Sequence, residues 1–242
     1  MRTGDVTGSI GGKAPPNSEA EWRSSANDWS TRYLNNRSDP DAAINYAQAL
    51  RATGQRAQAV AVLEQSALSN PNNKAVLGAY GRALADVGQY DQALDVLSRA
   101  HTPDAPDWRI LNVMGAVLDQ LGKPIEARRH YASALKIAPN EPSVLTNLGL
   151  SYALAKDLPR AENTLRRAVA QPKADPKARQ NLGLVIGLQG RFKEAEDIVR
   201  GDLPPAEAAA NVDFLKQMLA QQRERMSEET PDAPRAKRRT RG

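Results

Sequence analysis

Residues 108–141 read WRILNVMGAVLDQLGKPIEARRHYASALKIAPNE, and this stretch decides the fold. Its first half carries apolar or small residues at the i, i+3, i+4, i+7 spacing of one helical face: Leu111, Met114, Gly115 and Leu118. Gly122 ends this helix, because glycine adopts a left-handed turn without a Cβ clash. The second half repeats the helical spacing with Ala127, Tyr131, Ala134 and Leu135, and it stops at Pro139. Two short antiparallel helices cannot bury their apolar faces alone, so the stretch predicts a helix pair that packs against neighbouring pairs.

The same pattern occurs five times at a period of 34 residues, without a gap between the copies. We expect units at 40–73, 74–107, 108–141, 142–175 and 176–209. Position 8 of each unit is small (Ala47, Gly81, Gly115, Gly149, Gly183), and position 20 is always alanine (Ala59, Ala93, Ala127, Ala161, Ala195). Small residues let the two helices of a unit approach closely. These residues resemble the tetratricopeptide repeat, which implies an all-α fold, a right-handed α-solenoid of five helix pairs.

Local signals mark where each helix begins and ends. The residue before each unit is acidic or an asparagine that can cap the first helix: Asp39, Asn73, Asp107, Glu141 and Asp175. A glycine marks the turn inside four units, at Gly54, Gly88, Gly122 and Gly190, and the fourth unit has Lys156-Asp157 there. In the fifth unit Arg179 and Asp202 depart from the small or apolar residues of the other units.

The residues outside the five units are predicted to cap them. Residues 18–39 place Trp22, Ala26, Trp29 and Tyr33 on one face, which predicts an N-terminal capping helix or half-repeat, with a Trp-based ligand site as the alternative. Residues 206–226, after Pro204-Pro205, predict a C-terminal capping helix. We expect a disordered leader at 1–17 and a disordered basic tail at 227–242.

Charge and composition restrict the class of protein. The net charge is +5, but the last eight residues alone hold five basic residues and no acid, so the remainder is neutral. The chain has no cysteine, which excludes disulfides and thiolate metal sites. There is no apolar run of signal-peptide or membrane-span length. We therefore expect a cytoplasmic protein, or an exported one whose export segment is missing from this sequence.

Chemistry-bearing motifs are absent from the sequence, so we expect no enzyme, no cofactor and no metal. His101 and His130 lack an acidic partner at metal-ligand spacing. The segment Gly115 to Lys123 has the wrong spacing for a phosphate loop and lies inside a predicted helix. The tail can contact nucleic acid or an anionic membrane, although it has no aromatic residues for base stacking.

The resemblance to tetratricopeptide repeats implies a peptide-binding groove lined by positions 2, 5, 6, 9, 12 and 13 of the first helices. These positions hold Asn45, Gln48, Arg82, Arg109, Asn112, Asn147, Leu150, Leu154, Lys177, Gln180, Asn181, Leu184 and Leu188. An amide both donates and accepts hydrogen bonds, so the asparagines predict pairing with an extended peptide backbone, and the leucines predict apolar pockets. Only Arg109 and Lys177 match the family's clamp for a C-terminal carboxylate, so we do not expect that clamp. The alternatives are merely solvated groove residues, or a C-terminal helix lying over the leucines.

Three segments carry a closer resemblance: RILNVMGAVLDQLGK, IAPNEPSVLTNLGLSYALAKDLPRAE, and RQNLGLVIGLQGRF with DLPPAEAAANVDFLKQML. They resemble the TadD family, the tetratricopeptide proteins of Flp (tight-adherence, Tad) pilus assembly, over about residues 22–220. This resemblance implies a non-enzymatic assembly factor that acts on the pilus secretin and is periplasmic and associated with the outer membrane. The family's lipid anchor attaches to an N-terminal cysteine, which this sequence does not contain. The alternative is a cytoplasmic adaptor whose basic tail contacts nucleic acid or membrane.

Overall fold

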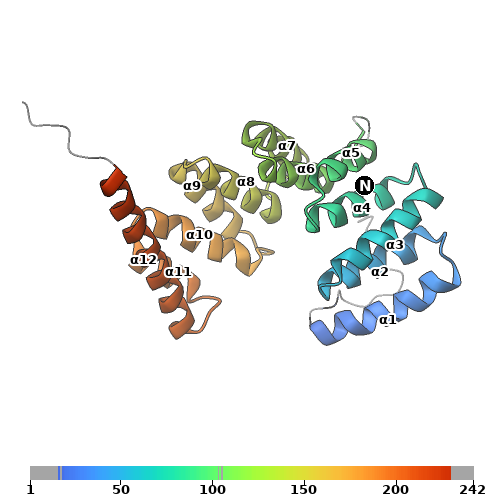
Figure 1. Cartoon of the computed structure of the whole chain (residues 1–242), viewed down its shortest axis with the longest axis horizontal. Coiled ribbons are helices and arrows are strands. Elements are labelled where there is room, and N and C mark those ends of the chain that lie inside the picture. The colour runs from blue at the N-terminus through green and yellow to red at the C-terminus, as the bar shows by residue number, and fades with distance from the viewer. Residues whose placement is uncertain (1–15, 17, 103, 105, 230–242) are drawn as a thin grey trace, which may run out of the picture. The chain divides into compact units, whose positions relative to one another are not determined.

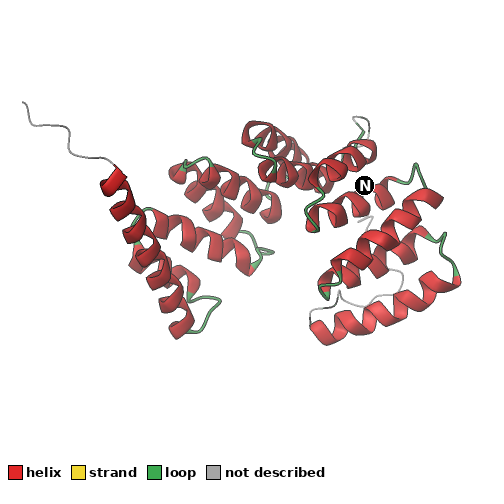
Figure 2. Ribbon diagram, viewed as in Figure 1, coloured by secondary structure: helices red, strands yellow, loops and turns green. Residues whose placement is uncertain are grey.

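The computed structural model describes residues 16, 18–102, 104 and 106–229. These residues form twelve α-helices and no β-strand (Figures 1 and 2), which confirms the prediction of an all-α fold. None of the described helices has the length and apolar composition of a membrane span. The predicted leader, apart from residue 16, and the basic residues of the predicted tail lie outside the described residues.

The chain divides into two compact units, residues 1–123 and 124–242. The boundary falls between the two helices of the third predicted repeat. The first unit contains α1 (Glu19–Asn35), α2 (Pro40–Ala52), α3 (Arg56–Ser69), α4 (Lys74–Asp86), α5 (Tyr90–Ala100) and α6 (Trp108–Gln120). The second unit contains α7 (Pro124–Ile137), α8 (Pro142–Leu154), α9 (Leu158–Val169), α10 (Pro176–Leu188), α11 (Phe192–Val199) and α12 (Pro205–Glu229).

The first helix of each repeat begins at the first residue of a 34-residue unit, because the preceding side chain caps it. The side chains of Asp39, Asn73, Asp107, Glu141 and Asp175 all accept backbone N–H groups of the first turn. The cap of Glu141 is the longest, at 3.4 Å from its Oε1 to the backbone nitrogen of Ser143. This length agrees with the poorer capping geometry of a glutamate.

The turns between the paired helices pass through a left-handed residue. The four predicted turn glycines have φ angles between 72° and 82°. Lys156 takes the same place in the fourth repeat with φ 61°, the one non-glycine residue with a positive φ in the described chain. The turn is thus set by backbone geometry that the repeat requires, even where no glycine supplies it.

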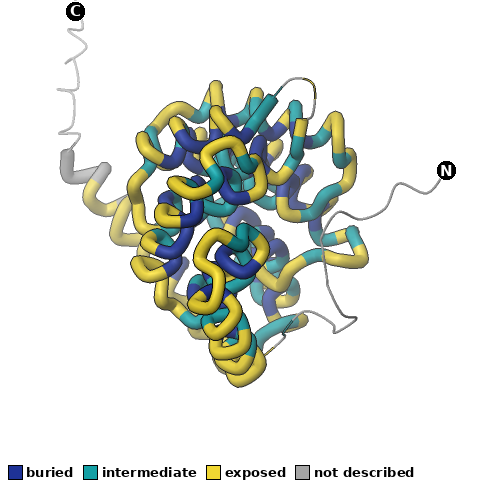
Figure 3. The backbone as a smooth tube through the Cα atoms, turned by 90° about the vertical axis from the view of Figure 1, so that its right-hand side faces the viewer, coloured by how far each residue is buried: buried dark blue, intermediate teal, exposed yellow. Residues whose placement is uncertain are grey.

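The two helices of a repeat pack closely against each other, and the small residue at position 8 permits this close approach. A Cβ atom added at Gly149 of α8 would lie 2.6 Å from Cγ of Leu165 in α9. The corresponding distances are 2.5 Å from Gly81 to Leu97 and 2.5 Å from Gly183 to Val199. Buried residues recur along each helix on the side that meets a partner, and exposed residues cover the opposite side (Figure 3).

The N-terminal helix α1 packs on α2 as the predicted cap. Tyr33 is buried, and its ring centroid lies 5.9 Å from that of Tyr46. Trp29 is half-buried against the same core cluster, and the Arg32 guanidinium lies 5.2 Å from its ring centroid. Trp29 therefore contributes to packing.

The C-terminal helix α12 takes the place of the first helix of a sixth repeat. Its buried residues are Ala208, Val212 and Leu215, and α10 buries Ala178, Leu182 and Val185 at the same spacing. α12 contacts both α10 and α11, as the first helix of a next repeat does. It therefore packs beside α10 as one more member of the series.

Candidate functional site

In the first unit, α2, α4 and α6 together form a hollow of about 370 Å³. Three of the predicted groove residues line it: Gln48 of α2, Arg82 of α4 and Arg109 of α6. Asn45 and Asn112 do not line it. The Asn45 amide nitrogen donates to the Asp41 carbonyl within α2 at 2.8 Å, and Asn112 is buried. This unit therefore presents no row of asparagines.

Gly78, at position 5 of the second repeat, lines the hollow and contributes no side chain to it. The neighbouring position-5 residue on α2 is Ile44, whose side chain forms one wall. A Cβ atom at Gly78 would lie 3.6 Å from the Ile110 side chain, an ordinary van der Waals distance, so α6 packs close to α4 at this point. Ala79 and Val113 complete an apolar lining. Aliphatic side chains therefore form only part of the lining, and polar and charged side chains form the rest.

Four cationic side chains line the same hollow, and three of them have partners. Arg51 pairs with Asp86. The Lys74 Nζ donates to the Thr102 Oγ1 at 2.7 Å. The Arg109 guanidinium lies 3.7 Å from the Asp107 carboxylate and 4.7 Å from the Trp108 ring centroid.

Arg82 is the fourth cation, and it differs from the others. It is half-buried, and no carboxylate among the described residues lies within ion-pair distance of its guanidinium. Burial lowers the pKa of Arg82, and repulsion from Arg51 adds to this lowering, whereas Asp86 and Asp107 oppose it from a distance. The hollow therefore contains a positive charge that the first unit itself does not neutralise.

The second unit presents a different surface, on which Lys177 is the one charged residue among the predicted groove residues. Its predicted groove residues on α8 are Asn147, Leu150 and Leu154, and those on α10 are Asn181, Leu184 and Leu188, with Lys177 and Gln180 nearer the start of α10. Leu154 is 67% exposed and Leu184 is 44% exposed. Helix α10 contacts both α8 and α12, so the three helices lie in series.

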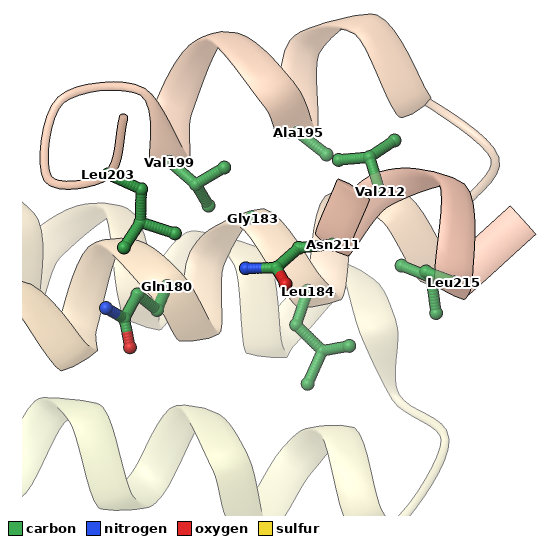
Figure 4. A pocket seen from close by; sticks show the side chains of 9 residues that line it. All are labelled: Gln180, Gly183, Leu184, Ala195, Val199, Leu203, Asn211, Val212 and Leu215. Atoms are coloured by element: carbon green, nitrogen blue, oxygen red, sulfur yellow. The ribbon is translucent and has the colours of Figure 1, made fainter. Parts of the chain in front are cut away.

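Helix α12 leaves these leucines open and adds residues of its own. Between α10, α11 and α12 lies a cavity of about 260 Å³, where Gln180 and Leu184 meet Asn211 and Leu215 (Figure 4). Phe214 and Met218 of α12 are 65% and 50% exposed.

Sequence reasoning missed Asn211, Phe214 and Met218, although the signal is present in the sequence. All three helices carry an asparagine, an apolar residue three positions later and another apolar residue four positions after that. We call these nine residues the three-helix stripe: Asn147, Leu150 and Leu154; Asn181, Leu184 and Leu188; Asn211, Phe214 and Met218. The pattern was hidden because α12 does not follow the 34-residue period.

Comparisons with known proteins agree with this architecture. The family model described as "Tetratricopeptide repeat" matches residues 113–179, and the model "Anaphase-promoting complex, cyclosome, subunit 3" matches residues 24–100. The chain carries tetratricopeptide repeats. A comparison with curated proteins finds no match. Tetratricopeptide repeats in general form protein–protein interaction scaffolds, and this is the coarse function that the matched repeats indicate.

Several solved tetratricopeptide structures share the fold at low sequence identity. The chain is similar to the APC/C hetero-tetramer Cut9-Hcn1, with a TM-score of 0.66 and 17% identity over 83% of this chain, but it spans only 40% of that chain. It is also similar to TTC0263, a thermophilic TPR protein of Thermus thermophilus, with a TM-score of 0.61 and 22% identity over 75% and 97% of the two chains. YrrB, titled a TPR protein with an unusual peptide-binding site, matches with a TM-score of 0.51 and 18% identity over 78% and 99%.

Proposed function

We propose that this protein holds a peptide segment of a partner protein along the three-helix stripe of its second unit. The observation that carries the proposal is the threefold recurrence of one asparagine and two apolar residues on α8, α10 and α12. The apolar side chains Leu154, Leu184, Phe214 and Met218 are exposed, although burying each of them would be favourable by about 1.5–3 kcal/mol. Clustered exposed apolar residues beside amides are typical of interaction surfaces.

We further propose that the partner belongs to the Flp (Tad) pilus machine and is its outer-membrane secretin. The support for this finer proposal is the resemblance of residues 22–220 to the TadD family. The same resemblance supports a periplasmic location in association with the outer membrane. YrrB, the tetratricopeptide neighbour described as having an unusual peptide-binding site, supports peptide binding as a use of this fold.

The test is binding of the purified secretin to the full-length protein, measured by biolayer interferometry. Replacing Phe214 and Met218 together with serine should weaken binding at least tenfold, because both side chains are exposed and lost burial is the main effect. The matched control is Ile125→Ser on α7, which removes an apolar side chain of similar exposure (64%) from the same unit. If the double variant and the control bind equally well, the three-helix stripe is not the binding surface.

Location is tested separately, by fractionating cells that carry an epitope-tagged copy of the complete gene. Recovery with the outer membrane or periplasm is the expected result. Recovery in the cytoplasm alone would contradict the pilus role and would favour the adaptor with a basic tail.

A further inference from the structure

We propose that the hollow above Gly78 in the first unit is a binding site for an aspartate or glutamate side chain within a partner peptide. The carboxylate would pair with the Arg82 guanidinium. This inference rests on the proposed peptide-binding function, and it adds a second site with its own specificity.

A carboxylate would supply the negative charge that the Arg82 guanidinium lacks. Arg82 lines the hollow and has no ion-pair partner among the described residues, whereas the nearby Arg51 is already paired with Asp86. A half-buried guanidinium without a counterion is unfavourable, and an incoming carboxylate removes that penalty. Arginine and a carboxylate also match in geometry, because two parallel N–H groups can donate to the two carboxylate oxygens.

The shape of the hollow also suits an acidic side chain. Gly78 contributes no side chain to the hollow, and the aliphatic side chains of Ile44, Ala79 and Val113 line it. Aliphatic walls suit the methylene groups of an acidic side chain, while Arg82 receives its charged end. Residues of α2, α4 and α6 line the hollow, so a bound segment would contact all three helices.

The other cations that line the hollow already have partners, which favours a carboxylate over a phosphate as the ligand. Lys74 is bonded to Thr102, and Arg109 lies near Asp107 and over the Trp108 ring, so both have contacts already. Thr102 is neutral and leaves the Lys74 charge in place, but Arg82 is the one guanidinium lining the hollow that has no ion-pair partner among the described residues. A carboxylate carries one negative charge, whereas a phosphate group carries up to two and needs several donors.

The experiment uses the full-length protein and fluorescein-labelled peptide libraries of eleven residues, with amidated C-termini. The central residue is glutamate, glutamine or phosphoserine, and the other positions are equimolar Ala, Val, Leu, Ser and Asn. Fluorescence anisotropy gives the affinity of each library. The glutamate library should bind about tenfold more tightly than the glutamine library, which is the scale of one charge-assisted hydrogen-bonded pair.

Four variants locate the effect. Arg82→Gln should abolish the preference for glutamate, and Arg82→Lys should retain part of it, because lysine keeps the charge without the paired N–H groups. Gly78→Leu should fill the hollow and also abolish the preference. Arg56→Gln removes the same charge from an exposed site on α3 and should leave the preference intact.

Equal binding of the glutamate and glutamine libraries, or a preference that persists in Arg82→Gln, would overturn the inference. Tighter binding of the phosphoserine library would assign the hollow to a phosphopeptide and reject the carboxylate. The glutamine library reports the proposed function independently, because it has no charge for Arg82. Binding of this library without a glutamate preference would reject only the acidic-residue site, whereas no binding of any library would count against both proposals.

Discussion

Acidification should loosen the second unit where Glu162 of α9 binds the turn between α10 and α11. The Glu162 carboxylate accepts hydrogen bonds from Arg191 at 2.8 and 3.0 Å, from Gln189 at 2.8 Å and from Arg166 at 2.9 Å. The bonds from Arg191 are the largest cause that lowers its pKa, and burial opposes them, so the pKa falls to about 2 from an ordinary value of 4.5. Glu194 joins the same cluster by accepting from both arginines.

The sign of the effect follows from the lowered pKa of Glu162. Because the folded pKa lies below the unfolded one, the stabilisation is complete above about pH 4.5 and is lost as the pH falls towards 2. The difference between the two pKa values corresponds to at most about 3 kcal/mol. Solvent screening at this partly exposed cluster reduces it to about 1–2 kcal/mol, of which about 1 kcal/mol should be lost by pH 3.

Hydrogen exchange followed by mass spectrometry is the suitable assay, because repeat arrays need not unfold in one step. All three tryptophans (Trp22, Trp29 and Trp108) belong to the first unit, so their fluorescence does not report on this cluster. After correction for intrinsic exchange rates, the opening free energy of amides in 158–199 should fall between pH 6 and pH 3. Glu162→Gln should remove most of this fall, and the exposed-site control Glu126→Gln should keep it. An equal fall in wild type and Glu162→Gln would refute the reasoning.

Two further predictions concern stability. Lys156→Gly should raise the free energy of unfolding by about 0.5–1 kcal/mol, because glycine adopts the left-handed φ of 61° without strain. Urea unfolding followed by circular dichroism checks this, and Lys156→Ala, which keeps the Cβ, should show no such gain. Arg179→Ala should destabilise by about 2 kcal/mol, because it leaves Asp202 (side chain 9% exposed) without the guanidinium that donates to both its oxygens. Adding Asp202→Ala to the Arg179→Ala variant should recover part of the lost stability. If the changes in unfolding free energy of the two single variants simply add in the double variant, the pairing is contradicted.

The helix boundaries were predictable from the sequence because their causes are local. A capping residue, a proline at the first helical position and a turn glycine each act on the backbone within a few residues. Every first helix therefore begins where a 34-residue unit begins, from Pro40 to Pro176. Lys156 shows the limit of residue-type reasoning, because the turn geometry persists where the favoured glycine is absent.

The candidate sites were predictable only in part, because they depend on residues from different helices. Arg179 and Asp202 read singly as two departures from the repeat, but the fold brings them together as one ion pair. The hollow in the first unit is lined by residues of three repeats, among them Gly78 and the Ile110 that the next repeat supplies. The repeat positions identify Arg82 as a groove residue. They do not show that it has no ion-pair partner among the described residues.

Helix α12 does not follow the 34-residue period, because the helix before it is short. Helix α11 has 8 residues, whereas the other second helices have 11 to 14, so the chain reaches α12 early. Ala208 follows Ala178 by 30 residues, whereas Ala178 follows Val144 by 34. The offset of four residues is close to one helical turn of 3.6 residues, so α12 keeps the same face towards α10.

This one-turn offset lets α12 extend the three-helix stripe. On the side where a second helix of a sixth repeat would pack, α12 carries Asp213 and Lys216, which are exposed. Lys216 donates to Asp213 at 2.9 Å and lies 5.6 Å from the Phe192 ring centroid, so this side of α12 is polar. Phe214 and Met218 lie at the stripe positions, where no capping role accounts for their exposure. Substitutions at Asp213 should therefore change the solubility of the protein and leave peptide binding intact. Substitutions at Phe214 should weaken peptide binding and leave the solubility unchanged.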